Sequence, residues 1–121
     1  LGLAGRALIV RGAWGGAVAG PFDLIVSNPP YVRSAEWQQL APEIREHEPE
    51  GALLAGEDGL DAYRALAMDL PRLLGQAGLA CLEHGHDQAD AVAAVMERAG
   101  FREIERRRDL GGRERTLLIG K

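Results

Sequence analysis

The stretch Phe22-Asp23-Leu24-Ile25-Val26-Ser27-Asn28-Pro29-Pro30-Tyr31 decides the fold class of this chain. Residues 22–27 form a short apolar run that is typical of a buried strand. Asn28-Pro29-Pro30 ends that strand, because two consecutive prolines cannot donate the hydrogen bonds of a central ladder. A rigid polar loop therefore follows a buried strand directly. In an open α/β sheet, ligands bind at this end of the strands.

Four further segments are expected to form strands. Residues 7–11 and 79–83 are short apolar runs like residues 22–27. Residues 101–108 and 114–119 flank Gly111-Gly112, which predicts an antiparallel hairpin at the end of the chain.

Two segments show the apolar spacing of amphipathic helices. The first is expected to begin at an N-cap at Asp58 and to run to Leu74, with Pro71 kinking or restarting it. The second is expected to run from a cap at Asp87 to Gly100. The long polar connection between the motif and the first helix predicts one helical turn near residues 35–40. This order of elements predicts an α/β fold: a parallel sheet with helices packed on it and an antiparallel hairpin at its edge.

Size and composition fit one domain with a real core. The chain has 121 residues, of which 46% are hydrophobic, and a net charge of −4. That acidic balance is unusual for a dedicated nucleic-acid binder, and no apolar run reaches the roughly 18 residues of a membrane span. The single cysteine, Cys81, excludes a disulfide framework and favours a reducing, cytoplasmic setting. No metal site is expected, since His84 and His86 have no third ligand at regular spacing.

Asn28-Pro29-Pro30-Tyr31 presents hydrogen-bond acceptors on a rigid backbone. Because the prolines carry no N–H, the loop offers the Asn28 side-chain oxygen and the Pro29 carbonyl. Two such acceptors suit the two hydrogens of a planar –NH2 group, and Tyr31 adds a flat face to stack on it. Holding both hydrogens aligns a weakly nucleophilic nitrogen for attack on a methyl group and stabilises the charge that develops. The motif predicts N-methyl transfer; the alternative is a plain Pro-Pro turn.

Residues 22–32 resemble the fourth strand and catalytic loop of class I S-adenosylmethionine-dependent N-methyltransferases. Residues 48–60, Leu82-Glu83-His84-Gly85 and residues 109–115 look like segments of the release factor glutamine methyltransferases (HemK/PrmC type). The resemblance covers nearly the whole chain. It implies S-adenosylmethionine as cofactor and N5-methylation of the glutamine in the Gly-Gly-Gln motif of peptide chain release factors.

The resemblance also assigns site residues. The residues that would clamp the substrate glutamine and make up the catalytic loop are Asn28, Pro29, Pro30 and Tyr31. Asn28 would contact the cofactor as well, and Trp14 falls where the family places an aromatic side chain beside the adenine. One departure from the family pattern is Ala13, where an Asp is usual.

By the same resemblance, residues 1–121 are the C-terminal part of a single methyltransferase catalytic domain. The family sheet has the strand order 3-2-1-4-5-7-6, and this chain supplies strands 3 to 7, with residues 7–11 as strand 3. It contains neither a glycine-rich loop after a first strand nor an acidic residue at the end of a second. We therefore expect a partial Rossmann-like sheet without its first two strands, and an isolated chain that is inactive and binds the cofactor weakly or not at all.

Other functions share the motif. A ribosomal-protein glutamine methyltransferase, a nucleic-acid amino-methyltransferase and a truncated non-catalytic fragment are the alternatives. The segment from Glu36 to Asp61 carries eight acidic residues against one arginine. Such a charge argues against a polyanionic substrate beside the motif, so no direct nucleic-acid substrate is expected.

Overall fold

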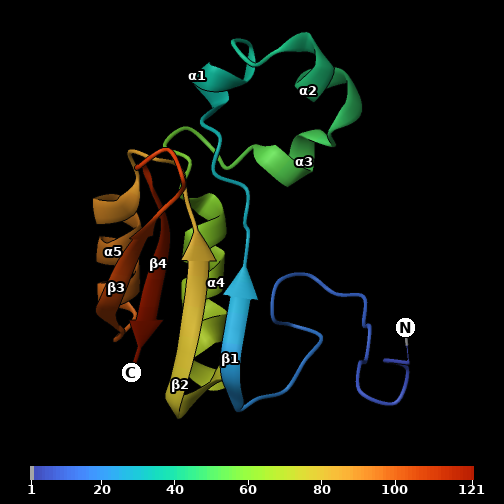
Figure 1. Ribbon diagram of the computed structural model, residues 1–121, viewed down its shortest axis with the longest axis vertical. Helices are drawn as coiled ribbons and strands as arrows, with labels where there is room; N and C mark the ends of the chain where they lie inside the picture. The colour runs from blue at the N-terminus through green and yellow to red at the C-terminus, as the bar shows by residue number, and fades with distance from the viewer. Residues whose placement is uncertain (1) are drawn as a thin grey trace.

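The computed structural model describes residues 2–121 (Figure 1). The elements follow the order β1 (Phe22–Ser27), α1 (Ser34–Trp37), α2 (Pro42–His47), α3 (Glu50–Leu53), α4 (Asp61–Leu73), β2 (Leu74–Glu83), α5 (Ala89–Arg98), β3 (Arg102–Arg108) and β4 (Glu114–Gly120).

The strands form one mixed sheet in the order β1-β2-β4-β3. β1 pairs with β2 in parallel, while β4 lies antiparallel between β2 and β3. The predicted terminal hairpin and the parallel pair are thus confirmed. The observed order is the 4-5-7-6 part of the strand order that the resemblance implied.

Helices α4 and α5 contact each other and pack on the same side of the sheet (Figure 1). Their apolar faces meet the inward-facing side chains of β2 and β4, and the core is centred on Tyr63, Leu70, Leu82, Met96 and Leu117. The opposite side of β1 is open, because Leu24 is 61% and Val26 72% exposed. Cys81 pairs with Val26 on this open side and is half-buried.

The predicted strand at residues 7–11 is wrong. This segment has no regular structure, and Leu8 and Ile9 are almost fully exposed. A strand needs a neighbour to satisfy its backbone groups, and no strand among residues 2–121 lies beside it. The segment runs outside the sheet, on the β1 side (Figure 1).

The starts of the two long helices also differ from expectation. Asp58 does not cap α4: its carboxylate accepts the Leu60 N–H at 3.0 Å, and the N-cap residue is Leu60. Gln88, not Asp87, precedes α5. Pro71 lies in the last turn of α4 and does not restart the helix, which runs on to Leu73.

The connection after the motif contains three short helices instead of one turn. α1 lies close to the predicted turn, whereas α2 and α3 were not predicted. Pro42 occupies the first turn of α2, a position that proline favours. The three helices lie beyond the carboxyl ends of β1 and β2 (Figure 1). Within residues 2–121, no helix combines the length and the apolar character needed to cross a membrane.

Tyr63 joins α4 to the carboxyl end of β2. Its ring is fully buried, and its hydroxyl donates a hydrogen bond of 2.7 Å to the Glu83 carbonyl. Burial raises the pKa of the Tyr63 phenol, so the group is neutral over the ordinary working range.

We expect Tyr63→Phe to lower the free energy of unfolding by about 1 kcal/mol at neutral pH, because one buried hydrogen bond is lost. The raised pKa in the folded state means that the phenol's contribution is full below its unfolded pKa of about 10 and is lost as the pH rises beyond it. The difference between wild type and variant should therefore change above about pH 10. Urea unfolding of both proteins at neutral and alkaline pH measures it, and a difference that is constant with pH contradicts the assignment.

Candidate active site

The candidate active site lies where β1 and β2 end side by side. The parallel register places Ser27 opposite Leu82, so Asn28 and Glu83 both follow at the same edge of the sheet. Asn28-Pro29-Pro30-Tyr31 leaves β1 at this edge, and His84-Gly85 leaves β2. The structure therefore brings the predicted catalytic loop and the loop after β2 together at the carboxyl ends of parallel strands, where α/β proteins bind ligands.

The four motif residues differ in exposure. Asn28 is exposed, Pro29 is buried, and Pro30 and Tyr31 are half-buried. Tyr31 packs against the core beneath the sheet edge. The motif is thus anchored at its prolines and at Tyr31, and it presents the amide of Asn28 to the outside.

The chain after the motif is held by main-chain hydrogen bonds. Val32 forms an isolated parallel bridge with Leu54. Its N–H donates to the Leu53 carbonyl at 2.8 Å, and its carbonyl accepts the Ala55 N–H at 2.9 Å. The segment that contains α1 to α3 is therefore tied back to the motif at both of its ends.

Gln88 is a buried polar residue that sequence reasoning missed. Its side chain is only 1% exposed. The side-chain oxygen accepts the Gly85 N–H at 2.9 Å, and the side-chain nitrogen donates to the carbonyls of Tyr31 at 3.1 Å and Gly59 at 3.4 Å. A glutamine beside a helix start is usually exposed, so no local signal distinguished it.

An ion pair also joins the segment after the motif to the loop after β2. The Arg33 guanidinium donates to Glu36 at 3.0 Å and to Asp87 at 3.1 Å. The bond to Glu36, and then that to Asp87, raise the pKa of Arg33 above its ordinary value despite partial desolvation. Asp87, predicted as a helix cap, thus serves as an ion-pair partner instead.

His84 is buried behind the motif. Its Nδ1 lies 2.8 Å from the Gly85 carbonyl, and its Nε2 has no hydrogen-bond partner within the described part of the chain. His86 is exposed. Across residues 2–121, no three His, Cys, Asp or Glu side chains gather in a way that could hold a metal ion.

Trp14 lies in the loop that precedes β1, away from β2. Its backbone adopts a left-handed conformation (φ 50°), and its side chain is 49% exposed. The loop is fastened to α4, because the Gly15 N–H donates to Asp69 at 3.0 Å and Arg72 donates to the Gly15 carbonyl at 2.8 Å. Arg72 also donates to the Val18 carbonyl at 3.0 Å.

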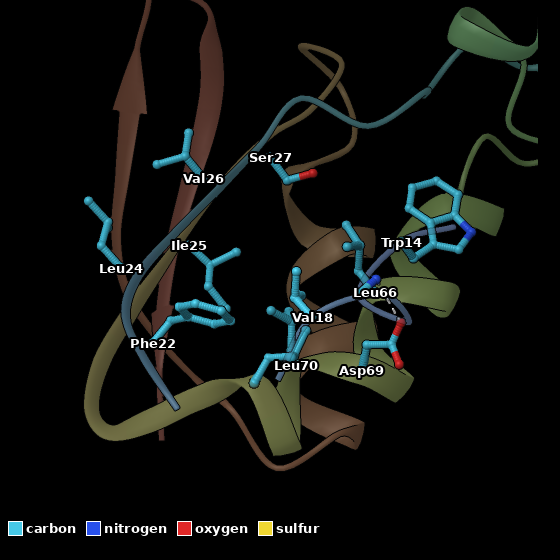
Figure 2. Close-up of a pocket in the computed structure, with 12 residues that line it drawn as sticks. Trp14, Val18, Phe22, Leu24, Ile25, Val26, Ser27, Leu66, Asp69 and Leu70 are labelled. Atoms are coloured by element: carbon cyan, nitrogen blue, oxygen red, sulfur yellow. Dashed lines mark hydrogen bonds between the residues drawn. The ribbon is translucent and has the colours of Figure 1, made fainter. Parts of the chain in front are cut away.

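A cavity of about 430 Å³ opens between this loop, β1 and α4 (Figure 2). Its wall is mostly apolar and contains Trp14, Val18, Phe22, Ile25, Ser27, Leu66, Asp69 and Leu70. Trp14 and Ser27 line the same cavity, and Ser27 directly precedes Asn28. The structure therefore places the two residues predicted to face the cofactor, Trp14 and Asn28, at or next to one hollow beside β1.

Comparison with known proteins gives a consistent answer. The chain is 52% identical to the release factor glutamine methyltransferase of Rhodospirillum rubrum over 118 residues, which are 98% of this chain and 36% of that protein. It is 44% identical to the protein of the same name from Caulobacter vibrioides, over 93% of this chain and 39% of the relative. The chain belongs to the release factor glutamine methyltransferase family. No protein-family model matches it.

A solved structure supports the same family. The crystal structure of the release-factor-specific protein-(glutamine-N5) methyltransferase of Alicyclobacillus acidocaldarius is 31% identical, with a TM-score of 0.50 over 82% of this chain and 48% of that protein. The predicted resemblance and the partial Rossmann-like fold are therefore confirmed. The chain spans well under half the length of the curated relatives named above and matches their C-terminal part.

Proposed function

We propose that this chain is the C-terminal part of a single catalytic domain that methylates N5 of the glutamine in the Gly-Gly-Gln motif of peptide chain release factors. S-adenosylmethionine is the proposed methyl donor. One observation carries the proposal: the Asn28-Pro29-Pro30-Tyr31 loop leaves a parallel strand pair with Asn28 exposed and the rest anchored. Support comes from relatives that bear the name of this activity. Since release factors act in translation, the proposed location is the cytoplasm.

The proposed roles follow from the geometry of the loop. The side-chain oxygen of Asn28 and the carbonyl of Pro29 accept the two hydrogens of the substrate amide. Tyr31, which is half-buried against the core, stacks on the plane of that amide. These contacts turn the nitrogen lone pair toward the methyl group and stabilise the positive charge that builds up on the nitrogen. A fixed geometry serves this purpose without a strong base: as the N–CH3 bond forms, the S–CH3 bond of the donor would break to leave a neutral thioether, and the acidic methylated nitrogen would release one proton to water.

The cavity beside Trp14 suits one part of the cofactor. Its apolar wall and the indole of Trp14 fit a planar heteroaromatic ring. Asn28 directly follows Ser27, the last residue of β1 in that wall, and would lie on the side of the methyl group. The one carboxylate in the wall, Asp69, accepts hydrogen bonds from Gly15 and Arg72 and so holds the Trp14 loop on α4. We propose that Trp14 and Asn28 supply one side of the cofactor site and that the N-terminal part of the domain supplies the rest. The S-adenosylmethionine supplies an electrophilic methyl group on a sulfonium.

The charge around the loop favours a protein substrate over nucleic acid. The segment of α1 to α3 lies next to the motif, and its residues 41–52 are all exposed. Carboxylates dominate it, with Arg45 as its single arginine between Ser34 and Asp61. A phosphate backbone at the site would meet repulsion that weakens as salt rises. A glutamine on a protein loop brings no such charge.

A hybrid enzyme tests the substrate. In this hybrid, the N-terminal part of the Rhodospirillum rubrum protein is fused to this chain, and this chain replaces the C-terminal segment of that protein that it matches. We expect transfer of labelled methyl from S-adenosylmethionine to a release factor with the Gly-Gly-Gln motif, and none to its Gln→Ala variant, to DNA or to RNA. If label appeared in a ribosomal protein or in nucleic acid and not in the release factor, the proposed substrate would be wrong, although the proposed methyl transfer would stand.

Asn28→Ala in the hybrid enzyme should lower the turnover number by about 100-fold or more, because the substrate amide loses a fixed acceptor. The melting temperature should not change, since Asn28 is exposed. Ser34→Ala changes an exposed polar residue at the start of α1; it is the matched control and should retain turnover. Near wild-type turnover in Asn28→Ala would remove this residue from the catalytic loop.

The isolated chain should show no measurable binding of S-adenosylmethionine by calorimetry at concentrations that saturate the hybrid enzyme. The physical reason is that one side of a cofactor site provides too few contacts to offset the loss of ligand freedom. Equal affinity in the two proteins would show that the cavity beside Trp14 is sufficient for binding.

A further inference from the structure

We infer that Gln88 is a positioning residue for the catalytic loop, acting through the peptide that follows Tyr31. The inference rests on the proposed function, since the loop it holds is the proposed glutamine clamp. Gln88 contacts no proposed substrate or cofactor atom. Its side chain instead joins three segments that are far apart in the sequence: the loop after β2, the clamp, and the loop before α4.

The amide of Gln88 has one possible orientation in this site. Its oxygen faces the Gly85 N–H, and its nitrogen faces two carbonyls, those of Tyr31 and Gly59. Turning the amide over would place an oxygen against two oxygens and an NH2 group against an N–H. Because the side chain is 1% exposed, water cannot replace a lost partner. The side chain is therefore an oriented link between the segments.

The peptide between Tyr31 and Val32 is held from both sides. Its carbonyl accepts the hydrogen bond from Gln88 at 3.1 Å, and its N–H donates to the Leu53 carbonyl at 2.8 Å. A peptide unit is planar and its C=O and N–H point in opposite directions, so two such bonds fix the orientation of the plane. Fixing this plane also fixes where the Tyr31 side chain leaves the backbone.

The clamp, residues 28–31, needs a hydrogen-bond donor from elsewhere in the chain to fix its backbone. Pro29 and Pro30 have no N–H, so the middle of the motif cannot secure itself through its own donors. The other link between the two loops pairs a half-buried Arg33 with Asp87, whose side chain is 51% exposed, so water screens this ion pair. Gln88 provides the buried link.

Two glycines make room for the Gln88 amide. A Cβ on Gly59 would lie 2.5 Å from the Gln88 nitrogen and 2.6 Å from the Tyr31 oxygen, and Gly59 has a φ of +75°. A Cβ on Gly85 would lie 2.7 Å from the Gln88 oxygen. Each glycine thus allows its backbone to approach the amide closely. The site is built around this side chain on both sides.

The test uses Gln88→Glu in the hybrid enzyme, with the exposed Gln76→Glu on β2 as the matched control. The variant keeps the size of the side chain and the acceptor for Gly85, but the ionised carboxylate has no donor for Tyr31. We expect the turnover number of Gln88→Glu to fall by about 10- to 100-fold at pH 8, with the control unchanged. Protonation restores a donor, and burial favours the protonated form, so the ratio of variant to wild-type turnover should rise as the pH falls to about 6.

A purely structural role gives a different result. It would lower the melting temperature and the yield of folded enzyme, while turnover per folded molecule and its pH ratio stayed at wild-type values. That outcome overturns the inference and leaves the proposed function standing.

A second measurement does not depend on activity. In the hybrid enzyme, Gln88→Met should speed hydrogen exchange of the Gly85 amide by about 10-fold or more, because its acceptor is removed, and Gln76→Met should not. If the hybrid enzyme transfers no methyl group, the proposed function fails, and this exchange still tests the link. An unchanged Gly85 exchange rate overturns the link itself.

Discussion

The parallel pairing of β1 with β2 places Ser27 opposite Leu82, and the rest of the site depends on that register. It brings the end of one strand, where Asn28 begins the clamp, beside the end of the other, where Gly85 begins the loop to α5. A register shift of one residue would turn the inward-facing side chains of β1 outward. The antiparallel β4 then secures β2 from its other side, so the strand that supports the site is central in the sheet.

Hydrogen bonds from buried polar side chains fix the orientation of the segments that form the site. The apolar core specifies which faces meet, but hydrophobic contact has little directional preference. Tyr63 and Gln88 add direction, since each makes a hydrogen bond from a fully buried side chain to a specific carbonyl near the strand ends. The clamp itself has few backbone donors because of its two prolines. Its geometry is therefore set largely by residues that come later in the chain.

Patterns within a few residues predicted much of this fold. The apolar run of β1 followed by two prolines, and the Gly-Gly turn of the hairpin, are local features, and the resemblance supplied the strand order. The strand expected at residues 7–11 failed because a strand forms only with a partner, which a run of apolar letters does not show. Gln88 could not be found in the same way, since its partner Tyr31 lies 57 residues away. The roles of Asn28, Pro29, Pro30, Tyr31 and Trp14 remain predictions.

The position of Asn28 explains how one residue could serve two ligands. The cavity beside Trp14 is lined by Ser27, the residue before Asn28, while the buried link from Gln88 holds the carbonyl of Tyr31, three residues after Asn28. Asn28 is thus the exposed first residue of the proposed clamp, next in sequence to a residue of the cavity wall. Because methyl transfer needs the two reactants in line within a short distance, a residue fixed at this position can orient the amide nitrogen toward the methyl group. The open, apolar side of β1 lies beside that position, with Leu24 and Val26 exposed. Covering it would remove water from the place where the two ligands meet and strengthen every contact that Asn28 makes there.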